Sequence, residues 1–161
     1  MARFAAIFAL CALAATALTV SACRFPLNVT GRVYLDTCNM GFETTESLYT
    51  HGSSVQLECK HRKTGKTVHN DTAVTDEEGN YSFTVMEDQG NARCQVSLVN
   101  CTHINAAGAT LGRDSSLVSL TCNNGMATSQ RLANNLGVNV KTTLQNCDQI
   151  VAQYHLDDDN F

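Results

Sequence analysis

The residue types that could do chemistry in this 161-residue chain are cysteines, histidines and asparagines in glycosylation triplets. Of eight cysteines, Cys11 lies in the apolar N-terminal stretch, and the other seven are far apart. Wide, irregular spacing favours disulfides over a metal site. Because seven is odd, at least one thiol is free, bonded to another molecule or removed by processing. These seven are Cys23, Cys38, Cys59, Cys94, Cys101, Cys122 and Cys147.

The five histidines form no recognisable catalytic or metal-binding motif. The chain has no His-Glu-x-x-His, no Gly-x-Ser-x-Gly and no phosphate-binding glycine loop. Residues 157–159 are acidic but lack the ligand spacing and glycine of a calcium loop. We therefore expect no enzyme activity, no cofactor and no bound metal. The histidines are His51, His61, His69, His103 and His155.

Four Asn-x-Ser/Thr triplets indicate N-glycosylation. Such acceptor triplets are glycosylated in proteins that follow the eukaryotic secretory route, and disulfides form in the same compartment. The two signals together predict a secreted, disulfide-stabilised glycoprotein. The acceptor residues are Asn28, Asn70, Asn80 and Asn100.

Residues 1–22 have the pattern of a secretory signal peptide, with Arg3, an apolar Ala-rich run and cleavage after Ala22. The run is short for a membrane span, which needs about 20 apolar residues. A bacterial lipoprotein signal, with Cys23 as the lipid-bearing N-terminus, is the alternative. The glycosylation triplets favour the first interpretation. We expect an extracellular protein that is not inserted in a membrane after cleavage.

Removal of 22 of the 161 residues leaves 139, which predicts one domain over residues 23–161. Arg3 is the only charged residue removed, so 10 basic and 15 acidic residues remain. A nucleic-acid partner requires a basic surface and is therefore not expected. Residues 60–63 with Lys66 form a basic cluster that could contact an acidic polysaccharide or an anionic receptor, although a solvated hairpin tip explains it as well. We expect a monomer.

Short segments of alternating or β-branched residues, separated by Gly, Asn and Asp, predict an all-β domain. Hairpin turns are expected at residues 63–65 and 76–80, and residues 105–108 are expected to form a long loop. A short helix is expected around Cys147, from Leu144 to Tyr154. The predicted strands span residues 27–35, 54–61, 67–75, 81–86, 92–99, 116–122 and 137–141.

The segment VTGRVYLDTCNMGFET, residues 29–44, resembles the signature of the olive-pollen major allergen family, the Ole e I-type proteins of pollen and anther. The family pattern is Gly-x-Val-Tyr-Cys-Asp-Thr-Cys-Arg, followed by Gly-Phe. The order and spacing of further matches extend the resemblance over nearly all of the mature chain. They include residues 52–59, 74–81, 94–98, 120–125 and 132–137.

This resemblance implies a small antiparallel β-barrel or sandwich of about seven strands with a short C-terminal helix and three disulfides. It implies bonds between Cys38 and Cys147 and between Cys59 and Cys94. It also implies a secreted, non-enzymatic, N-glycosylated protein of pollen or another reproductive tissue, and many members of the family are allergens. Family members are associated with pollen maturation, hydration and tube growth.

This chain departs from the family pattern at several positions. Leu35 replaces the first family cysteine, which leaves Cys101 without its expected partner, and Cys122 is an additional cysteine. We hypothesise a Cys101–Cys122 bond, with Cys23 as a competing partner of either, or two bonds and free thiols. Further departures are Asn39 in place of arginine, Asn135 where proline is common, and a shortened segment between Cys94 and Cys101.

The function expected from these observations is extracellular signalling or a matrix role in pollen development, hydration or tube growth. The expected partner is a receptor-kinase ectodomain or a component of the cell wall. The alternative is an extracellular carrier of a small apolar ligand. A carrier requires a cavity, and strands rich in Val, Leu and Phe leave little room for one in a domain of this size.

Overall fold

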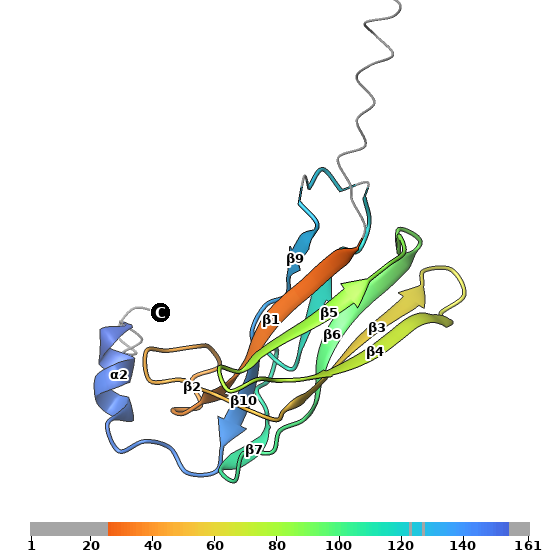
Figure 1. The fold of residues 1–161 in the computed structure, drawn as a ribbon. Helices are drawn as coiled ribbons and strands as arrows, with labels where there is room; N and C mark the ends of the chain where they lie inside the picture. Colours follow the sequence, from red (N-terminus) through yellow and green to blue (C-terminus); the bar gives the residue numbers. More distant parts are fainter. Residues whose placement is uncertain (1–25, 123, 127, 155–161) are drawn as a thin grey trace, which may run out of the picture.

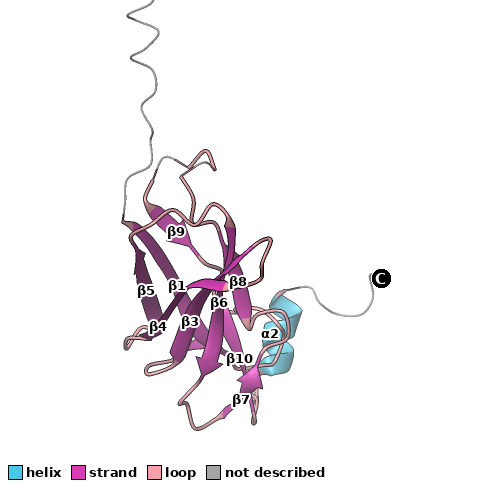
Figure 2. Cartoon of the chain, turned by 90° about the vertical axis from the view of Figure 1, so that its right-hand side faces the viewer, coloured by secondary structure: helices cyan, strands magenta, loops and turns pink. Residues whose placement is uncertain are grey.

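The computed structural model describes residues 26–122, 124–126 and 128–154. The described chain is mostly strand, as predicted (Figures 1 and 2). One short helix, α2, lies near the C-terminus at Cys147–Gln153. The strands are β1 (Leu27–Asp36), β2 (Leu48–Tyr49), β3 (Ser54–His61), β4 (Thr67–Val74), β5 (Asn80–Val85), β6 (Ala92–Asn100), β7 (Ala106–Ala109), β8 (Ser115–Val118), β9 (Gln130–Leu132) and β10 (Leu136–Val140).

The first sheet is organised around β1, the longest strand. The N-terminal half of β1 pairs with β5 on one side and β9 on the other. Its C-terminal half pairs with β2 and β10, and β7 lies beyond β10. The pairings of β1 with β9 and with β10 are parallel. The expectation of a purely antiparallel domain is therefore wrong at the strand that carries the family signature.

The second sheet has the order β4-β3-β6-β8 and is antiparallel throughout. The predicted hairpin at residues 63–65 joins β3 to β4, and its turn is closed by a hydrogen bond from Gly65 N to His61 O. The predicted turn at 76–80 leads from β4 to β5, where Asp76 N donates to Asn80 O. Both turn predictions are confirmed.

The core lies between the two sheets and is filled by side chains from both. On β3, Val55, Leu57 and Cys59 are buried and alternate with more exposed residues, because successive side chains of a strand point to opposite faces. Leu35, at the position of the first family cysteine, is also buried in this core. The described strands form two sheets rather than one closed barrel.

Three short strands were not predicted. β7 occupies part of the segment expected to be a long loop, and β2 and β9 are only two and three residues long. Each gains its hydrogen bonds by lying beside a longer strand, so local residue pattern gives little sign of it. Among the described residues, no helix is long and apolar enough to cross a membrane.

Candidate functional site: the signature loop

The candidate functional site is the loop of residues 37–47, called here the signature loop. It follows β1, leads to β2, and lies beside α2 at one end of the molecule (Figure 1). Several of its residues are exposed or half-buried, including Asn39, Phe42 and Glu46. The loop is held by bonds to β1, β10 and α2, which are described in turn.

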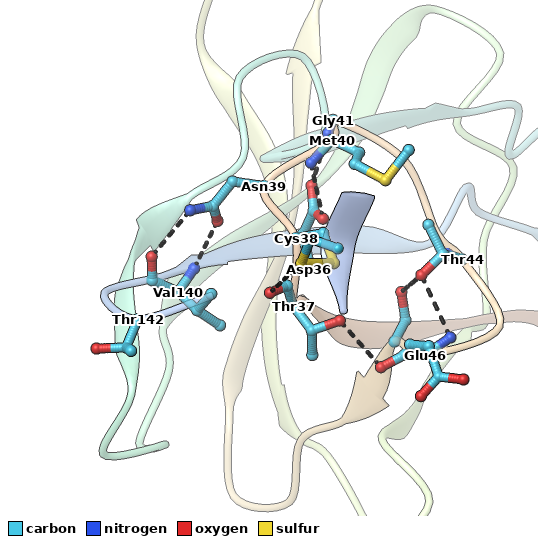
Figure 3. Close-up of a disulfide and its surroundings, with 12 residues drawn as sticks. Asp36, Thr37, Cys38, Asn39, Met40, Gly41, Thr44, Glu46, Val140 and Thr142 are labelled. Carbon is cyan, nitrogen blue, oxygen red and sulfur yellow. Dashed lines mark hydrogen bonds between the residues drawn. A yellow bond between two sulfur atoms is a disulfide. The ribbon is translucent and has the colours of Figure 1, made fainter. Parts of the chain in front are cut away.

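Asp36, the last residue of β1, fixes the first turn of the signature loop. Its side chain is fully buried. One carboxylate oxygen accepts a hydrogen bond from Met40 N at 2.9 Å, and the other accepts one from Gly41 N at 2.6 Å (Figure 3). A buried carboxylate needs such partners because an unpartnered one costs several kcal/mol. The family-signature aspartate therefore has a structural role, since both of its oxygens are occupied.

Asn39 joins the signature loop to β10. Its side-chain Nδ2 donates to Val140 O at 3.1 Å, and its Oδ1 accepts from Val140 N at 2.8 Å (Figure 3). The side-chain amide thus bonds to the strand edge much as a neighbouring backbone would. The backbone of Asn39 has φ 53°, a left-handed conformation that asparagine adopts more readily than most residues. An arginine, which the family pattern has here, cannot form this two-way amide pair because it has no acceptor.

A disulfide between Cys38 and Cys147 attaches α2 to the loop, with a Cα–Cα distance of 5.5 Å. This is the pairing that the resemblance implied. Thr37 adds two bonds, because its hydroxyl donates to Glu46 O and its carbonyl accepts from Leu144 N. The segment before α2 is therefore fixed to the loop by backbone as well as by the covalent bond.

Aromatic and carboxylate contacts fix the second half of the loop. The rings of Phe42 and Tyr154 meet edge to face with centroids 5.2 Å apart, and Thr45 N donates to the Tyr154 hydroxyl. Glu43 accepts hydrogen bonds from the Tyr49 hydroxyl at 2.5 Å and from Asn135 Nδ2 at 2.6 Å. Asn135, the second departure from the family pattern, therefore also binds the loop.

Tyr34 of β1 lines a hollow together with residues of the loop and is almost completely buried. Burial raises the pKa of its phenol, and the positive charge of Arg113 opposes this shift. A hollow of about 290 Å³ adjoins it, lined by Tyr34, Phe42, Glu43, Arg113, Asn134 and Asn135. The hydroxyl of Tyr34 has no hydrogen-bond partner among the described residues.

Asp36 and Glu43 are both engaged by hydrogen-bond donors, as described above. Within residues 26–122, 124–126 and 128–154, no three His, Cys, Asp or Glu side chains gather in a way that could hold a metal ion. The loop is cross-linked to two strands and a helix, so it presents a defined surface.

The structure contains the second bond implied by the resemblance, Cys59–Cys94. These residues stand directly opposite each other on β3 and β6, with Cα atoms 4.0 Å apart. The predicted Cys101–Cys122 bond is wrong, because Cys101 is a free thiol and Cys122 is disulfide-bonded. The alternative of two bonds with all other thiols free is wrong for Cys122 as well. Cys23 lies outside the described residues.

The pairing of β6 with β8 explains why Cys101 and Cys122 do not meet. Cys94 stands opposite Val118, and Ser97 stands opposite Ser115. Cys101 therefore follows one end of this strand pair, whereas Cys122 follows the other. A disulfide requires Cα atoms within about 7 Å, and antiparallel pairing carries the two cysteines in opposite directions.

The four predicted glycosylation sites differ in their surroundings. Asn70 on β4 and Asn100 at the end of β6 are exposed. Asn28 on β1 is half-buried, and its Oδ1 lies 3.4 Å from the Thr84 hydroxyl. Asn80 is fully engaged: its Oδ1 accepts from Arg32, and its Nδ2 lies within hydrogen-bond distance of Asp76 and Glu78. A glycan on Asn80 would replace one of these two N–H bonds.

Other predicted residues lie apart from the signature loop. The basic cluster is at the exposed tip of the β3–β4 hairpin, where Lys60 forms an ion pair with Glu58 at 2.9 Å. The histidines His51, His61, His69 and His103 are spread over strands and loops. His155 and the acidic residues 157–159 lie outside the described residues. Sequence reasoning missed the roles of Glu43 and Tyr154, but the departures at Asn39 and Asn135 marked positions that the structure shows to be important.

Comparison with known proteins places this arrangement in a family. Residues 25–155 match the family model described as "Pollen protein Ole e 1 like". The chain is 38% identical over 132 residues to Pollen-specific protein C13 of Zea mays, covering 82% of this chain and 78% of that protein. It is 35% identical over 135 residues to Protein DOWNSTREAM OF FLC of Arabidopsis thaliana, covering 84% and 82% respectively.

The fold is also found in a solved structure. The crystal structure of the major plantain pollen allergen Pla l 1 superposes with a TM-score of 0.68 and 24% identity, covering 76% of this chain and all of that one. The family match spans the signature loop, both sheets and α2. The chain therefore belongs to the Ole e 1-like family of pollen proteins.

Proposed function

We propose that this protein is a secreted, non-enzymatic protein of pollen or another reproductive tissue that acts by binding. Its partner would be a receptor-kinase ectodomain or a component of the cell wall, and its role would lie in pollen development, hydration or tube growth. Relatives named as pollen-specific, anther-specific or pollen-allergen proteins support the tissue. The disulfides are consistent with an oxidising, extracellular environment.

The observation that carries this proposal is the cross-linking of the signature loop. Asp36, Asn39 and the Cys38–Cys147 bond fix a loop that leaves Thr45 and Glu46 exposed. A loop fixed before binding loses little conformational entropy on complex formation, and pre-organisation of this kind favours affinity. Binding residues are found disproportionately on loops that a rigid scaffold positions.

Binding to intact pollen tubes by labelled protein tests the proposal. We expect saturable binding that unlabelled protein displaces. Thr45→Arg with Glu46→Lys should weaken it at least tenfold, because both side chains are exposed and the backbone bonds of the loop remain. Glu87→Lys, at an exposed position between β5 and β6, makes the same charge change as Glu46→Lys away from the loop; it is the control and should bind like the wild type. Equal loss of binding in both variants, or non-saturable binding of all three proteins, would count against the signature loop.

The alternative function, a carrier of a small apolar ligand, has less support. A hollow of about 690 Å³ is open to solvent and lies where β1 and β5 approach the end of β4, with polar residues such as Thr30, Arg32 and Ser82 in its lining. An apolar ligand is better held by a predominantly apolar, enclosed pocket. Native mass spectrometry of protein purified from plant tissue would support a carrier if a stoichiometric lipid copurified.

A further inference from the structure

The strand β4 forms an open edge of the second sheet. It is hydrogen-bonded to β3 and is the terminal strand in the order β4-β3-β6-β8. Six of its eight residues are exposed and the other two are half-buried. In Figure 1, β4 lies along the outer side of the molecule. An edge strand of this length presents unpaired backbone groups and is a template for pairing with another chain.

Asn70 is the fourth residue of this strand and belongs to the triplet Asn70-Asp71-Thr72. It stands opposite Glu58 on β3. The neighbouring Gln56 side chain donates from Nε2 to Asn70 Oδ1 at 2.8 Å. The Nδ2 atom of Asn70, which would bear a glycan, donates to no described residue. Its environment is thus the opposite of that of Asn80, whose amide nitrogen is near two acceptors.

We propose that Asn70 carries an N-linked glycan and that this glycan prevents β4 from pairing with β4 of a second copy of the protein. The proposal rests on the secretory route included in the proposed function. In the transfer reaction, Asn70 Nδ2 bonds to C1 of a lipid-linked oligosaccharide pyrophosphate. The C1–O bond breaks, the lipid pyrophosphate leaves, and one amide proton is lost.

The residues of β4 make one self-pairing register favourable. Two copies of β4 can pair in an antiparallel way about a two-fold axis perpendicular to the sheet. In such a pair, the side chains of directly opposite residues lie on the same face of the sheet. A register centred on Asn70 places His69 of each copy opposite Asp71 of the other copy, so that two such pairs form. A register centred on Asp71 instead places two like charges opposite each other, which is destabilising. Of these two registers, the one centred on Asn70 therefore avoids a like-charge pair and brings an imidazole and a carboxylate together on each side of the axis.

The same register explains how a glycan would block the pairing. It places the two Asn70 side chains directly opposite each other, and such pairs have Cβ atoms about 5 Å apart. Two oligosaccharides cannot both leave one sheet face at that separation. Asn100 is the last residue of β6 and lies beyond the residues of β6 that pair with β8. It is not part of β4. A glycan there leaves the β4 edge open.

Sequon variants of the full chain secreted from plant cells test this proposal. Asn70→Gln and Thr72→Ala both abolish the triplet, whereas Thr72→Ser retains it and Asn100→Gln removes a different one. Glycopeptide mass spectrometry measures the fraction of Asn70 that carries a glycan. Light scattering after size-exclusion chromatography measures the molar mass of the protein. The protein is loaded at about 100 µM, within the range where exposed strand edges associate. We expect occupied Asn70 and monomers for the wild type, Thr72→Ser and Asn100→Gln, and dimers for Asn70→Gln and Thr72→Ala.

A second change identifies the surface that pairs. Val68→Lys combined with Asn70→Gln should restore the monomer, because lysine on an edge strand opposes pairing. An unmodified Asn70 in the secreted wild type, monomeric Asn70→Gln and Thr72→Ala proteins, or dimers that persist in the double variant would each overturn the proposal. Receptor binding is not measured in this experiment, so its outcome is independent of whether the signature loop binds a partner.

Discussion

At the residue scale, two glycines of the first sheet are required by tyrosines on neighbouring strands. Gly31 on β1 stands opposite Tyr81 on β5, and Gly137 on β10 stands opposite Tyr34 on β1. A Cβ atom on Gly31 would overlap the Tyr81 hydroxyl oxygen, and one on Gly137 would lie 2.8 Å from that of Tyr34. Each tyrosine ring thus occupies the space left by a missing side chain.

The Gly31–Tyr81 pair leads to a test of packing. Gly31→Ala should lower the free energy of unfolding by about 1–3 kcal/mol, the usual cost of overpacking a filled core. Tyr81→Phe should cost less than about 1 kcal/mol or be stabilising, because the buried hydroxyl has no hydrogen-bond partner among the described residues. Denaturant unfolding measures both, and combining the two changes should recover part of the loss, since Phe lacks the clashing oxygen. A double variant no more stable than Gly31→Ala would contradict this packing explanation.

Asp88 gives a test of pH dependence at the residue scale. Its carboxylate accepts hydrogen bonds from Cys122 N, Gly90 N and Thr121 Oγ1. Backbone donation from Cys122, the largest cause, lowers the pKa of Asp88 below its ordinary value of 3.8. The associated stability is therefore present above pH 3.8 and is lost as the pH falls through the lowered pKa. The side chain is exposed, so we expect a contribution below about 1 kcal/mol.

Unfolding at a series of pH values checks the Asp88 prediction. Asp88→Asn should flatten the fall in stability below pH 3.8, because the amide does not titrate. Glu87→Gln is the matched control, since Glu87 accepts no hydrogen bond from the described residues. If the stability of Asp88→Asn falls with pH below 3.8 as steeply as that of the wild type, or if Glu87→Gln flattens this fall equally, Asp88 is not the group that causes the acid dependence.

At the element scale, a buried arginine of β9 binds backbone carbonyl groups that precede this strand in the chain. Arg131 on β9 is 2% exposed, and its guanidinium donates to the carbonyl oxygens of Ser119, Thr121 and Thr128. A buried charge needs such partners. Ser119, Thr121 and Thr128 are therefore held together by a side chain that local sequence pattern would assign to the surface.

The attachment of α2 is a second test at the element scale. The helix has seven residues, and Ile150 is its only buried one. A helix this short is not stable in isolation, so we expect the Cys38–Cys147 bond to contribute much of what holds it in position, beside the hydrogen bond from Leu144 N to Thr37 O. For a sequence separation of 109 residues, the chain-entropy model predicts that this bond adds about 4–5 kcal/mol to the free energy of unfolding.

Removal of that bond should therefore be measurable. Cys38→Ser with Cys147→Ser should lower the denaturant midpoint by an amount equivalent to roughly 3–5 kcal/mol and increase amide exchange in α2. Cys101→Ser is the control, because Cys101 is a free thiol, and its midpoint should change much less. Retained protection of α2 in the double variant would show that noncovalent contacts alone hold the helix.

At the scale of the whole molecule, both sheets contribute to one core cluster. Leu27 and Val29 of β1 lie in the same buried cluster as Val55 and Leu57 of β3. A chain of this size with one core usually unfolds in a single cooperative step. Neither sheet can retain its buried face without the other.

Cooperativity of unfolding tests this dependence. With the disulfides intact, thermal unfolding should be followed by near-ultraviolet circular dichroism, which reports tertiary structure, and by far-ultraviolet circular dichroism, which reports secondary structure. Both signals should show one transition at the same temperature. The Cys101→Ser variant should be used to prevent disulfide exchange on heating. Two separated transitions would mean that the sheets unfold independently.

The sequence by itself determined the features that depend on neighbouring residues. The alternation of Val55, Leu57 and Cys59 predicted a half-buried strand, because strand side chains alternate between faces. The turns at 63–65 and 76–80 were readable from their Gly, Asn and Asp residues. The resemblance supplied the Cys38–Cys147 and Cys59–Cys94 pairs, and local spacing could not have done so.

Only the tertiary structure decided which distant segments meet. The parallel pairing of β1 with β9 and β10 joins residues about 100 positions apart, and the strand register places Cys101 and Cys122 at opposite ends of the β6–β8 pair. The two hydrogen bonds between Asn39 and Val140 likewise join residues 101 positions apart and depend on the same arrangement. Local sequence sets which face of a strand is apolar, whereas the partner and register follow from the packing of the whole core.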